Sequence, residues 1–329
     1  MKKEIRYILV IGLGSMGKRR IRLISEINDI VVVGVDGNME RCREVEEKFG
    51  VKTYSNLEEA LQSNKFNCAF VCTSPLSHAD IIHKCLENNL HLFSEINLVG
   101  DKYIENMALA EQKGKILFLS STFLYRKETQ YIIDIAQQSD CKMNYNYHVG
   151  QYLPDWHPWE NYNDYFIGNY RTNGCREIMA IEMPWLVSAF GKITNVQLLK
   201  GKNTSLNISY NDNYLMLIEH ELGTKGIFAV DVMTRKAVRH FELYGENLYL
   251  TWNGTPDSLM QYDIDIKQET YLTFDNASEH QEGYAAFVSE NPYREEIKAF
   301  FECIEGKDVA KWSFDRDIHV LQTIDKIEA

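Results

Sequence analysis

The sequence predicts an α/β protein: an N-terminal doubly wound parallel sheet, then a C-terminal α/β domain with a large, open, mostly antiparallel sheet. Up to about residue 120, short apolar segments alternate with amphipathic helical ones, the pattern of a parallel sheet covered by helices. From about Asn195 to Leu272, strand-like segments follow one another with short turns, which predicts antiparallel pairing. We therefore expect one domain over residues 1–122 and another over residues 123–329.

The first strand leads directly into a glycine-rich turn. Tyr7–Ile11 is a continuous apolar run, typical of a central strand that is buried on both faces. The turn and the start of the next helix contain Gly12, Gly14, Ser15, Met16 and Gly17. Glycines at this spacing let the backbone turn tightly and approach a pyrophosphate, and the helix N-terminus attracts phosphates. We expect a bound dinucleotide here; glycines that serve packing alone are the alternative.

Asp36 stands at the end of the second predicted strand, Ile30–Val35. A carboxylate at this position accepts hydrogen bonds from ribose hydroxyls and repels a 2′-phosphate. NAD is therefore the expected cofactor and NADP the less favoured one. Arg41 and Arg43 follow closely enough to keep NADP open.

The other elements of the first domain continue in the same rhythm. We expect helices to about Ile27 and over Met39–Phe49, Leu57–Leu61 (capped by Ser55 or Asn56), His78–Asn89 and Asp101–Lys113, and strands near Tyr54 and over Cys68–Cys72, His91–Ser94 and Ile116–Ser120. Six strands in this order make a complete dinucleotide-binding fold.

The segment Thr73-Ser74-Pro75 follows the fourth strand, at the sheet edge where α/β proteins bind ligands. We expect this segment and His78 to lie against the cofactor, with Pro75 and His78 shaping the floor beneath the nicotinamide. The alternative is purely local: Ser77 caps a helix that begins near His78.

The second half begins with a strand and an aromatic loop. In chain order we expect a strand near Lys142–Val149, the loop Gln151–Trp159, a helix over Glu177–Phe190 that ends at Gly191, strands over Tyr214–Glu221, Gly226–Met233 and His240–Leu243, a turn at Gly245 into Leu248–Trp252, and helices over Pro292–Ile304 and Asp315–Ile327.

Composition excludes several classes of function. The 329 residues carry a formal net charge of −12, so we expect neither a nucleic-acid partner nor an anionic membrane. The seven cysteines are scattered without a Cys-x-x-Cys pair, which predicts reduced thiols and no structural metal. We see no leader and no apolar run of membrane-spanning length, so the expected location is the cytoplasm.

These motifs resemble the glucose–fructose oxidoreductase/inositol dehydrogenase/MocA (Gfo/Idh/MocA) family over nearly the whole chain. The resemblance rests on Gly12-x-Gly14-x-x-Gly17, Asp36, Thr73-Ser74-Pro75-x-x-His78, Glu95, Tyr125-Arg126, the helix at Gly174 and the segment Trp312-Ser313-Phe314. It implies a Rossmann domain and a second domain whose sheet often forms the oligomer contact, here of a homodimer or homotetramer. It also implies hydride transfer between NAD(P) and a carbinol of a sugar, cyclitol or related compound.

The chain departs from the family pattern at two catalytic places. Where the family has Glu-Lys-Pro, this chain has Glu95-Ile96-Asn97, so the lysine that helps to bind and activate the substrate hydroxyl is absent. On the helix at Gly174, Ile178 and Ile181 stand where the family carries an aspartate and the proton-handling histidine.

Oxidation of an alcohol also removes a proton, so another base must serve. We expect Glu182 or His157 to take this role, with Glu95 or Tyr125 in support. The alternatives are structural: Glu182 is a buried acid paired with an arginine such as Arg176, and His157 is a packed loop residue.

The aromatic loop resembles a sugar-binding wall. It gathers Tyr152, Asp155, Trp156, Trp159, Asn161 and Tyr162. Aromatic faces cover the apolar side of a sugar ring and short polar groups bind its hydroxyls, whereas a core aromatic cluster is the alternative. The stretch Gly150–Trp156, followed by Asn161-Tyr162, also resembles a branch of the family found with bacterial surface-polysaccharide enzymes. That resemblance favours a sugar, a sugar phosphate or a nucleotide sugar as the substrate.

Three functions remain open. The first is an NAD-dependent oxidoreductase that acts on a carbohydrate with altered proton-handling residues. The second keeps NAD but uses transient oxidation to assist an elimination, an epimerisation or a glycoside cleavage. The third is a binding or regulatory protein that kept the cofactor fold without redox chemistry. Asp36 and the polar aromatic loop favour an enzyme.

Overall fold

The computed structural model describes residues 5–158, 160–274 and 289–329. The chain forms two compact units. The first contains the described residues up to Ser121 and the segment Arg294–Ile318; the second contains the described residues of Thr122–Tyr293 and His319–Ala329.

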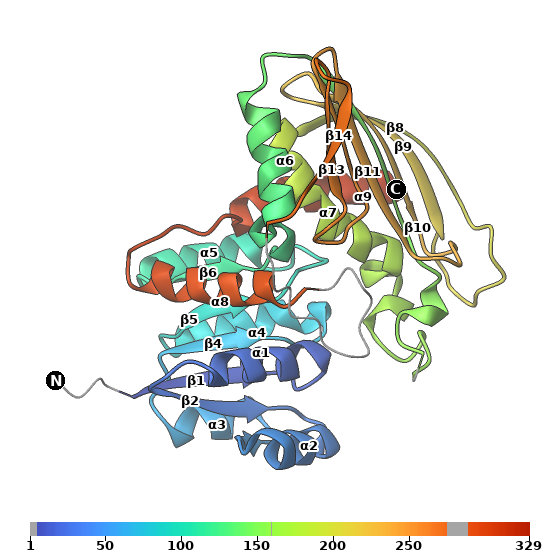
Figure 1. The fold of residues 1–329 in the computed structure, drawn as a ribbon. Helices are drawn as coiled ribbons and strands as arrows, with labels where there is room; N and C mark the ends of the chain where they lie inside the picture. Colours follow the sequence, from blue (N-terminus) through green and yellow to red (C-terminus); the bar gives the residue numbers. More distant parts are fainter. Residues whose placement is uncertain (1–4, 159, 275–288) are drawn as a thin grey trace. The chain divides into compact units, whose positions relative to one another are not determined.

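The first unit is built on a six-stranded parallel sheet. Its strands are β1 (Arg6–Ile11), β2 (Ile30–Val35), β3 (Lys52–Tyr54), β4 (Cys68–Val71), β5 (His91–Ser94) and β6 (Leu117–Leu119), and its helices include α1 (Ser15–Ser25), α2 (Met39–Phe49), α3 (Leu57–Ser63), α4 (Pro75–Glu87) and α5 (Tyr103–Gln112). The strand order is β3-β2-β1-β4-β5-β6, most of which Figure 1 shows directly. This order, with the switch between β1 and β4, is that of a doubly wound dinucleotide fold, so the predicted fold class is confirmed.

An aromatic layer explains why a C-terminal segment belongs to the first unit. Phe70, Phe93 and Phe118 lie side by side on β4, β5 and β6, with ring centroids 4.7 and 5.1 Å apart. Phe300 of α8 (Asn291–Ile304) packs on all three, at 5.3–5.6 Å and steep angles. Most of α8 therefore completes the first unit, and the contiguous division at residues 123–329 differs from the observed one in this segment.

The second unit is built on an eight-stranded sheet. Its elements are η1 (Thr122–Tyr125), α6 (Lys127–Gln138), β7 (Met143–Gly150), η2 (Leu153–Asp155), η3 (Phe166–Gly168), η4 (Tyr170–Thr172), α7 (Gly174–Phe190), β8 (Ile193–Gly201), β9 (Asn213–His220), β10 (Lys225–Asp231), β11 (Val238–Gly245), β12 (Leu248–Trp252), β13 (Leu259–Asp263) and β14 (Gln268–Leu272), followed by α9 (Phe314–Glu328), which enters this unit at His319. The order is β14-β13-β12-β11-β7-β10-β9-β8, and every pair is antiparallel except β7 with β10. The predicted open, mostly antiparallel sheet is confirmed.

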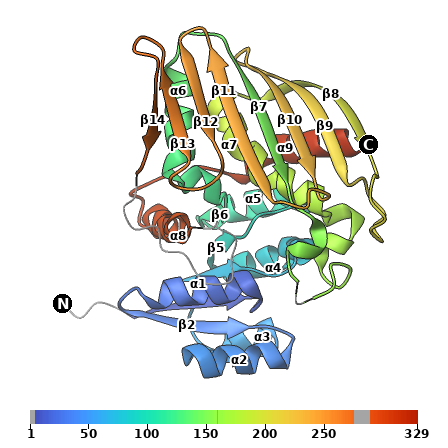
Figure 2. The same ribbon diagram turned by 45° about the vertical axis from the view of Figure 1, so that its right-hand side comes forward.

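One face of this sheet is covered by helices. Figure 2 shows α6 and α7 against it. Along β7, Tyr145 and Tyr147 are buried on the covered face, and the alternating residues Asn144 and Asn146 point to the other face. Helix α7 begins at Gly174, three residues before its predicted start, because the Asn173 side chain accepts a hydrogen bond from the Arg176 amide at 2.8 Å.

The described helices and the described His, Cys, Asp and Glu side chains were expected to form neither a membrane span nor a metal site. None of the helices in the described ranges is long and apolar enough to cross a membrane. No group of three or more His, Cys, Asp or Glu side chains in those ranges is arranged to hold a metal ion. All seven cysteines are free thiols.

Candidate functional site

The three glycines of the turn after β1 meet different surroundings. A Cβ on Gly12, which has a φ of +91°, would lie 2.7 Å from backbone atoms of Cys72 and Thr73. A Cβ on Gly17 would lie 1.8 Å from the Gly12 carbonyl oxygen. A Cβ on Gly14 would meet only an Arg41 side-chain nitrogen, at 3.9 Å. Gly12 and Gly17 are therefore required by packing, whereas the space beside Gly14 fits a closely approaching pyrophosphate.

Asp36 follows β2 directly and lies beside the glycine turn. Its carboxylate accepts hydrogen bonds from the Leu13 and Asn38 amides, each at 2.8 Å. The Arg41 guanidinium lies 3.7 Å from the same carboxylate and is about half exposed. Asp36, the acid expected to bind the ribose, is thus held next to the glycine turn, and the Arg41 side chain lies beside it.

The segment after β4 forms the start of α4. Pro75 occupies the first helical position and Ser74 precedes it, so the helix begins three residues before the predicted His78. Proline suits this position because its missing N–H would have no helical partner there. Ser77 is not the cap: its hydroxyl contacts the Thr73 hydroxyl and the Ser74 carbonyl, each at 2.8 Å.

His78 is buried beneath this segment. Its Nε2 donates to the Thr73 carbonyl at 2.9 Å, and its Nδ1 lies 2.6 Å from the Asn97 side-chain amide. Burial lowers the pKa of His78, so the ring is neutral near pH 7. Both ring nitrogens are used within the protein, and His78 therefore holds the position of Thr73.

Glu95 lies in a buried ion cluster. Its carboxylate accepts from Arg20 Nε at 2.6 Å, and Arg20 Nη2 also donates to Glu296 at 2.7 Å. Glu296 accepts further hydrogen bonds from the Ser120 hydroxyl at 2.9 Å and the Ser121 amide at 2.7 Å. Burial, opposed by Arg20 but supported by Glu95, raises the pKa of Glu296. Glu95 is thus a partner of Arg20 that orders the ends of β5 and β6.

Glu182 lies in a second buried cluster, on α7. One carboxylate oxygen accepts from Arg239 Nε and Nη2 at 3.0 and 2.7 Å, and the other accepts from the Tyr147 hydroxyl at 2.6 Å and Trp185 Nε1 at 2.9 Å. No part of Glu182 is exposed. The expected partner Arg176 is not the one observed: it pairs instead with Asp325, at 2.6 Å, and Glu328.

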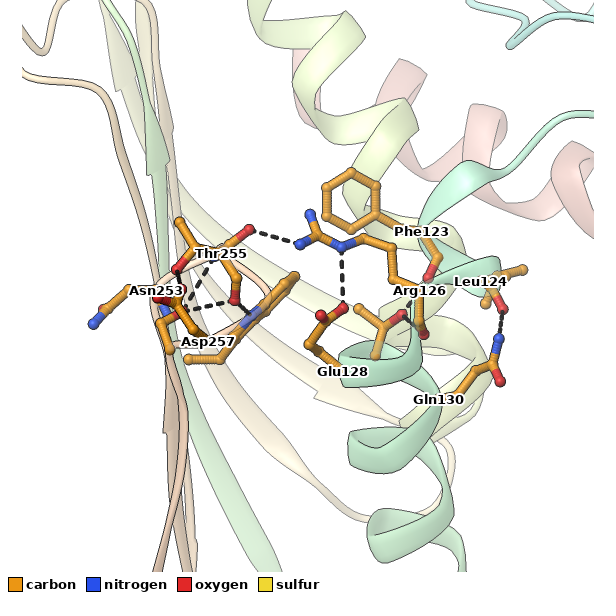
Figure 3. A network of polar contacts seen from close by, with 12 residues as sticks. Phe123, Leu124, Arg126, Glu128, Gln130, Asn253, Thr255 and Asp257 are labelled. Carbon is orange, nitrogen blue, oxygen red and sulfur yellow. Dashed lines mark hydrogen bonds and ion pairs between the residues drawn. The ribbon is translucent and has the colours of Figure 1, made fainter. Parts of the chain in front are cut away.

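The segment that follows β6 places Tyr125 and Arg126 at the start of α6. Tyr125 is buried at the end of η1. Arg126 donates to the Gly254 carbonyl at 2.8 Å and pairs with Glu128 at 3.3 Å, as Figure 3 shows. Its guanidinium also lies over the Trp252 ring at 4.9 Å. Burial lowers the pKa of Arg126. Arg126 thus joins η1 to the β12–β13 turn.

The aromatic loop keeps several rings partly exposed. His157 stacks on Tyr165, with ring centroids 4.8 Å apart, and its Nδ1 lies 2.7 Å from Glu160. Its side chain remains about one third exposed. Tyr152, Trp156 and Tyr162 are also partly exposed, so the loop is not a core cluster; Trp159 lies outside the described residues.

The positions that depart from the family pattern are aliphatic and well packed. Ile178 is 6% exposed, and Ile96 and Ile181 are partly exposed. Glu177, next to Ile178, is a candidate that the residue pattern does not single out, because an acid in the first turn of a helix is ordinary. Burial raises the pKa of Glu177 to about 7. The available signal is that Glu177 is one of two acids on a mostly apolar helix.

Comparison with known families identifies the first unit. The sequence profile of the Gfo/Idh/MocA family, described as an oxidoreductase family with an NAD-binding Rossmann fold, matches residues 6–121. The chain is 30% identical to biliverdin reductase A of Mus musculus over 127 residues, which are 38% of this chain and 42% of that protein. It is also 30% identical to the myo-inositol 2-dehydrogenase of Thermotoga maritima over 109 residues, 31% of this chain and 33% of that protein. The chain therefore spans less than half the length of these relatives.

A solved structure resembles the fold of the whole chain. The WlbA dehydrogenase from Bordetella pertussis, in complex with NADH and UDP-GlcNAcA, superposes with a TM-score of 0.76 over 99% of this chain and 95% of that one. The sequences are 14% identical, so this likeness concerns the fold alone.

Proposed function

We propose that the protein is an NAD-dependent oxidoreductase that transfers a hydride to or from a carbohydrate-type substrate, namely a sugar, a sugar phosphate or a nucleotide sugar. The match of residues 6–121 to the profile of the Gfo/Idh/MocA oxidoreductase family supports this proposal. The observation that carries the proposal is the glycine turn, where Gly12 and Gly17 are sterically required and only Gly14 borders open space. A carbohydrate is favoured by the partly exposed rings of the aromatic loop and by the likeness to a myo-inositol 2-dehydrogenase.

The residues proposed to hold the cofactor come from the carboxyl ends of β1, β2, β4 and β5. They are Gly12, Gly14, Ser15, Met16, Gly17, Asp36, Thr73, Ser74, Pro75, His78 and Glu95. When bound, NAD supplies hydride chemistry at its nicotinamide. The start of α1 binds phosphate, Asp36 binds the ribose, and His78 and Glu95 act indirectly, by holding Thr73 and Arg20.

Among the four acid–base candidates, His157 and Tyr125 are the proposed proton-handling pair, and Glu95 and Glu182 support them. Glu95 and Glu182 each neutralise a buried arginine, so both carboxylates are engaged in ion pairs within the protein. His157 has a partly exposed ring with Glu160 as the orienting acid, the arrangement that general bases use.

Homo-oligomer formation through the uncovered face of the eight-stranded sheet is part of the proposal. Leu199, Leu215, Leu217 and Ile227 are each at least half exposed on this face. The register pairs Leu199 with Leu215 and Leu217 with Ile227, so the four form one patch. An apolar patch of paired strands suits association with a second copy.

Turnover with a panel of sugars tests the redox proposal. We expect NADH formation, followed by its absorbance, with at least one sugar, sugar phosphate or nucleotide sugar, and His157→Gln should lower kcat/KM by about 100-fold or more. Tight NAD binding without turnover of any sugar would instead support the binding-protein alternative, which the aliphatic Ile96, Ile178 and Ile181 favour. Isotope exchange at a substrate carbon without net NADH would support the epimerase or lyase alternative.

A further inference from the structure

A cavity opens at the amino ends of the parallel strands of the first unit. It has a volume of about 600 Å³, and its lining comes from β1, β4, β5, α8 and the segments before β4, β5 and β6. All of these lining residues belong to the first unit. Ligand pockets have volumes of about 300–1,000 Å³, so this one has room for a small molecule. We call it the amino-edge cavity.

Strand register places the amino-edge cavity opposite to the glycine turn. Ile8 of β1 pairs with Cys68 of β4, and Cys68 pairs with His91 of β5. Cys68 and His91 are the first residues of their strands, whereas Gly12 and Asp36 follow the last residues of β1 and β2. A parallel strand rises about 3.3 Å per residue, so strands as short as β4 separate the two edges of the sheet by about 13 Å. The cavity is therefore separate from the proposed cofactor site.

Positive charges line the amino-edge cavity, and no Asp or Glu of the described residues does. The charged side chains are those of Arg6, Lys65 and Lys115. Lys65 and Lys115 make no ion pair within the described ranges. Arg6 lies 3.7 Å from the Glu305 carboxylate, which is closer to Lys307, at 2.6 Å. In a protein of net charge −12, such a group of cations indicates an anionic ligand.

Two neutral side chains of the cavity also offer N–H groups. His91 Nδ1 accepts a hydrogen bond from the Ile116 amide at 3.0 Å, so its Nε2 carries the hydrogen. Burial and the charge of Lys115 lower the pKa of His91, so the ring is neutral near pH 7. Asn67 Oδ1 accepts from the Tyr7 amide at 3.0 Å, which leaves its side-chain NH₂ group as a donor. Both donors suit the oxygens of an anion.

Helix ends alone do not account for the two lysines. Helices α3 and α4 end beside the cavity, and lysines near helix C-termini are ordinary. The carbonyl of Glu87, the last residue of α4, accepts a hydrogen bond from Lys113 Nζ at 2.9 Å. Lys113 does not line the cavity. Within the described ranges, Lys65 and Lys115 donate to no helix-end carbonyl, so their ammonium groups are available to a ligand.

The wall of the cavity is apolar. Phe66 and Phe301 are almost buried, at 7% and 8% exposed, and both line it. The Arg6 guanidinium lies over the Phe301 ring, 4.9 Å from its centre. The cavity thus sets positive charge directly beside aromatic surface. A bare inorganic anion would leave this apolar surface in contact with water, whereas an apolar ligand body would bury it.

We propose that the amino-edge cavity binds a small organic anion, whose carboxylate or phosphate group lies among Arg6, Lys65 and Lys115 and whose apolar body covers Phe66 and Phe301. Three positive charges repel a cation, and a neutral molecule gains no attraction from them. Because the dinucleotide is proposed to bind at the opposite edge of the sheet, the two ligands can be bound together. The inference goes beyond the proposed function and does not depend on it.

Displacement of a fluorescent anion tests the site in the wild-type protein. The dye anilinonaphthalene sulfonate is bound to the full chain at a saturating concentration of NAD, and its fluorescence reports displacement by benzoate, benzamide or inorganic phosphate. We expect benzoate to act at a concentration about tenfold lower than either of the others. Benzamide has the same ring without the charge, and phosphate has the charge without the ring. Phenyl phosphate, compared with benzoate, distinguishes the two head groups.

Matched double variants assign the dye to the cavity. Lys65→Met with Lys115→Met should weaken dye binding about tenfold or more and abolish the preference for benzoate over benzamide. Lys48→Met with Lys52→Met removes the same charge from exposed positions of the first unit outside the cavity and should retain both. All four lysines are at least partly exposed, and thermal unfolding checks that both variants fold. No dye binding at saturating NAD, equal displacement by benzoate and benzamide, or unchanged dye affinity after loss of Lys65 and Lys115 would overturn the proposal.

Discussion

The glycine turn after β1 and the helix α7 differ in how closely they follow the pattern that the sequence resembles. The turn has Gly12, Gly14 and Gly17, whereas α7 has Ile178 and Ile181 where the resemblance implies an aspartate and a histidine. At the turn, two of the glycines face backbone atoms that cannot move away. Side chains on α7 instead face other side chains, so they can change while the helix and its packing persist.

The same comparison separates three acids that a sequence cannot distinguish. Glu95 and Glu182 are each bound to a buried arginine, whereas Glu177 is partly exposed and has no counter-ion among the described residues. A buried ion pair is a structural element, and an unpaired carboxyl is the kind of group that binds or transfers a proton. The difference is set by Arg20 and Arg239, which are distant from the acids in sequence.

The largest expected effect is at Glu182. Glu182→Ala leaves Arg239 buried without its counter-ion and removes the acceptor of Tyr147 and Trp185. We expect the free energy of unfolding to fall by about 3–5 kcal/mol, measured by urea denaturation. The double variant Glu182→Leu with Arg239→Met, which removes both charges, should recover most of the loss. A fall of less than about 1 kcal/mol for the single variant would mean that the pair is not structural.

The turn is tested by comparing two of its glycines. Gly17→Ala places a Cβ 1.8 Å from the Gly12 carbonyl and should cost about 3 kcal/mol of stability and abolish NAD binding. Gly14→Ala meets only Arg41 and should leave stability within about 0.5 kcal/mol of wild type. It should still weaken NAD binding about tenfold or more, because the Cβ enters the pyrophosphate space. Fluorescence titration with NADH and thermal unfolding separate the two outcomes; equal effects of both variants on stability would contradict the assignment.

Cofactor choice is expected to depend on Asp36. Asp36→Ser removes the carboxylate that repels a 2′-phosphate and leaves Arg41 beside it, so the affinity ratio of NADP to NAD should rise about tenfold. The further change Arg41→Ala should cancel this gain. If the ratio stays unchanged in Asp36→Ser, the ribose end of the cofactor lies elsewhere.

The smallest effect is a pH dependence at the end of α7. His220 donates from Nδ1 to the Gly191 carbonyl at 2.9 Å and accepts from the Tyr145 hydroxyl at 3.0 Å, which suits a neutral ring. Burial lowers the pKa of His220 to about 4, below the unfolded value of about 6.5. The unfolded state therefore binds more protons between these values, and stability falls as pH falls through this window, by about 1 kcal/mol at pH 5.5. His220→Gln should remove this contribution, so the difference in unfolding free energy between the wild type and the variant should change by about 1 kcal/mol between pH 7 and about 5.5; a difference that does not vary with pH would exclude His220 as a source.

Much of the fold was predictable because local patterns determine it. The strands Ile30–Val35 and His91–Ser94 and the helix Met39–Phe49 match the prediction residue for residue, since continuous apolar runs and helical periodicity leave few alternatives. Helix α4 begins three residues before its predicted start, because Pro75 occupies the first helical position, where its missing N–H has no helical partner. The return of α8 to the first unit was not predictable, because it depends on the contact of Phe300 with three distant strands.

By itself, the sequence determined the dinucleotide turn, the acid after β2 and the absence of the family lysine and histidine, because these are statements about residue identity at fixed local spacing. Only the tertiary structure decided which acids are neutralised. Arg20 reaches Glu95 across 75 positions of the sequence, and Arg239 reaches Glu182 across 57. Electrostatic surroundings arise from chain segments that folding brings together, and they set both the charge state and the role of a carboxyl group.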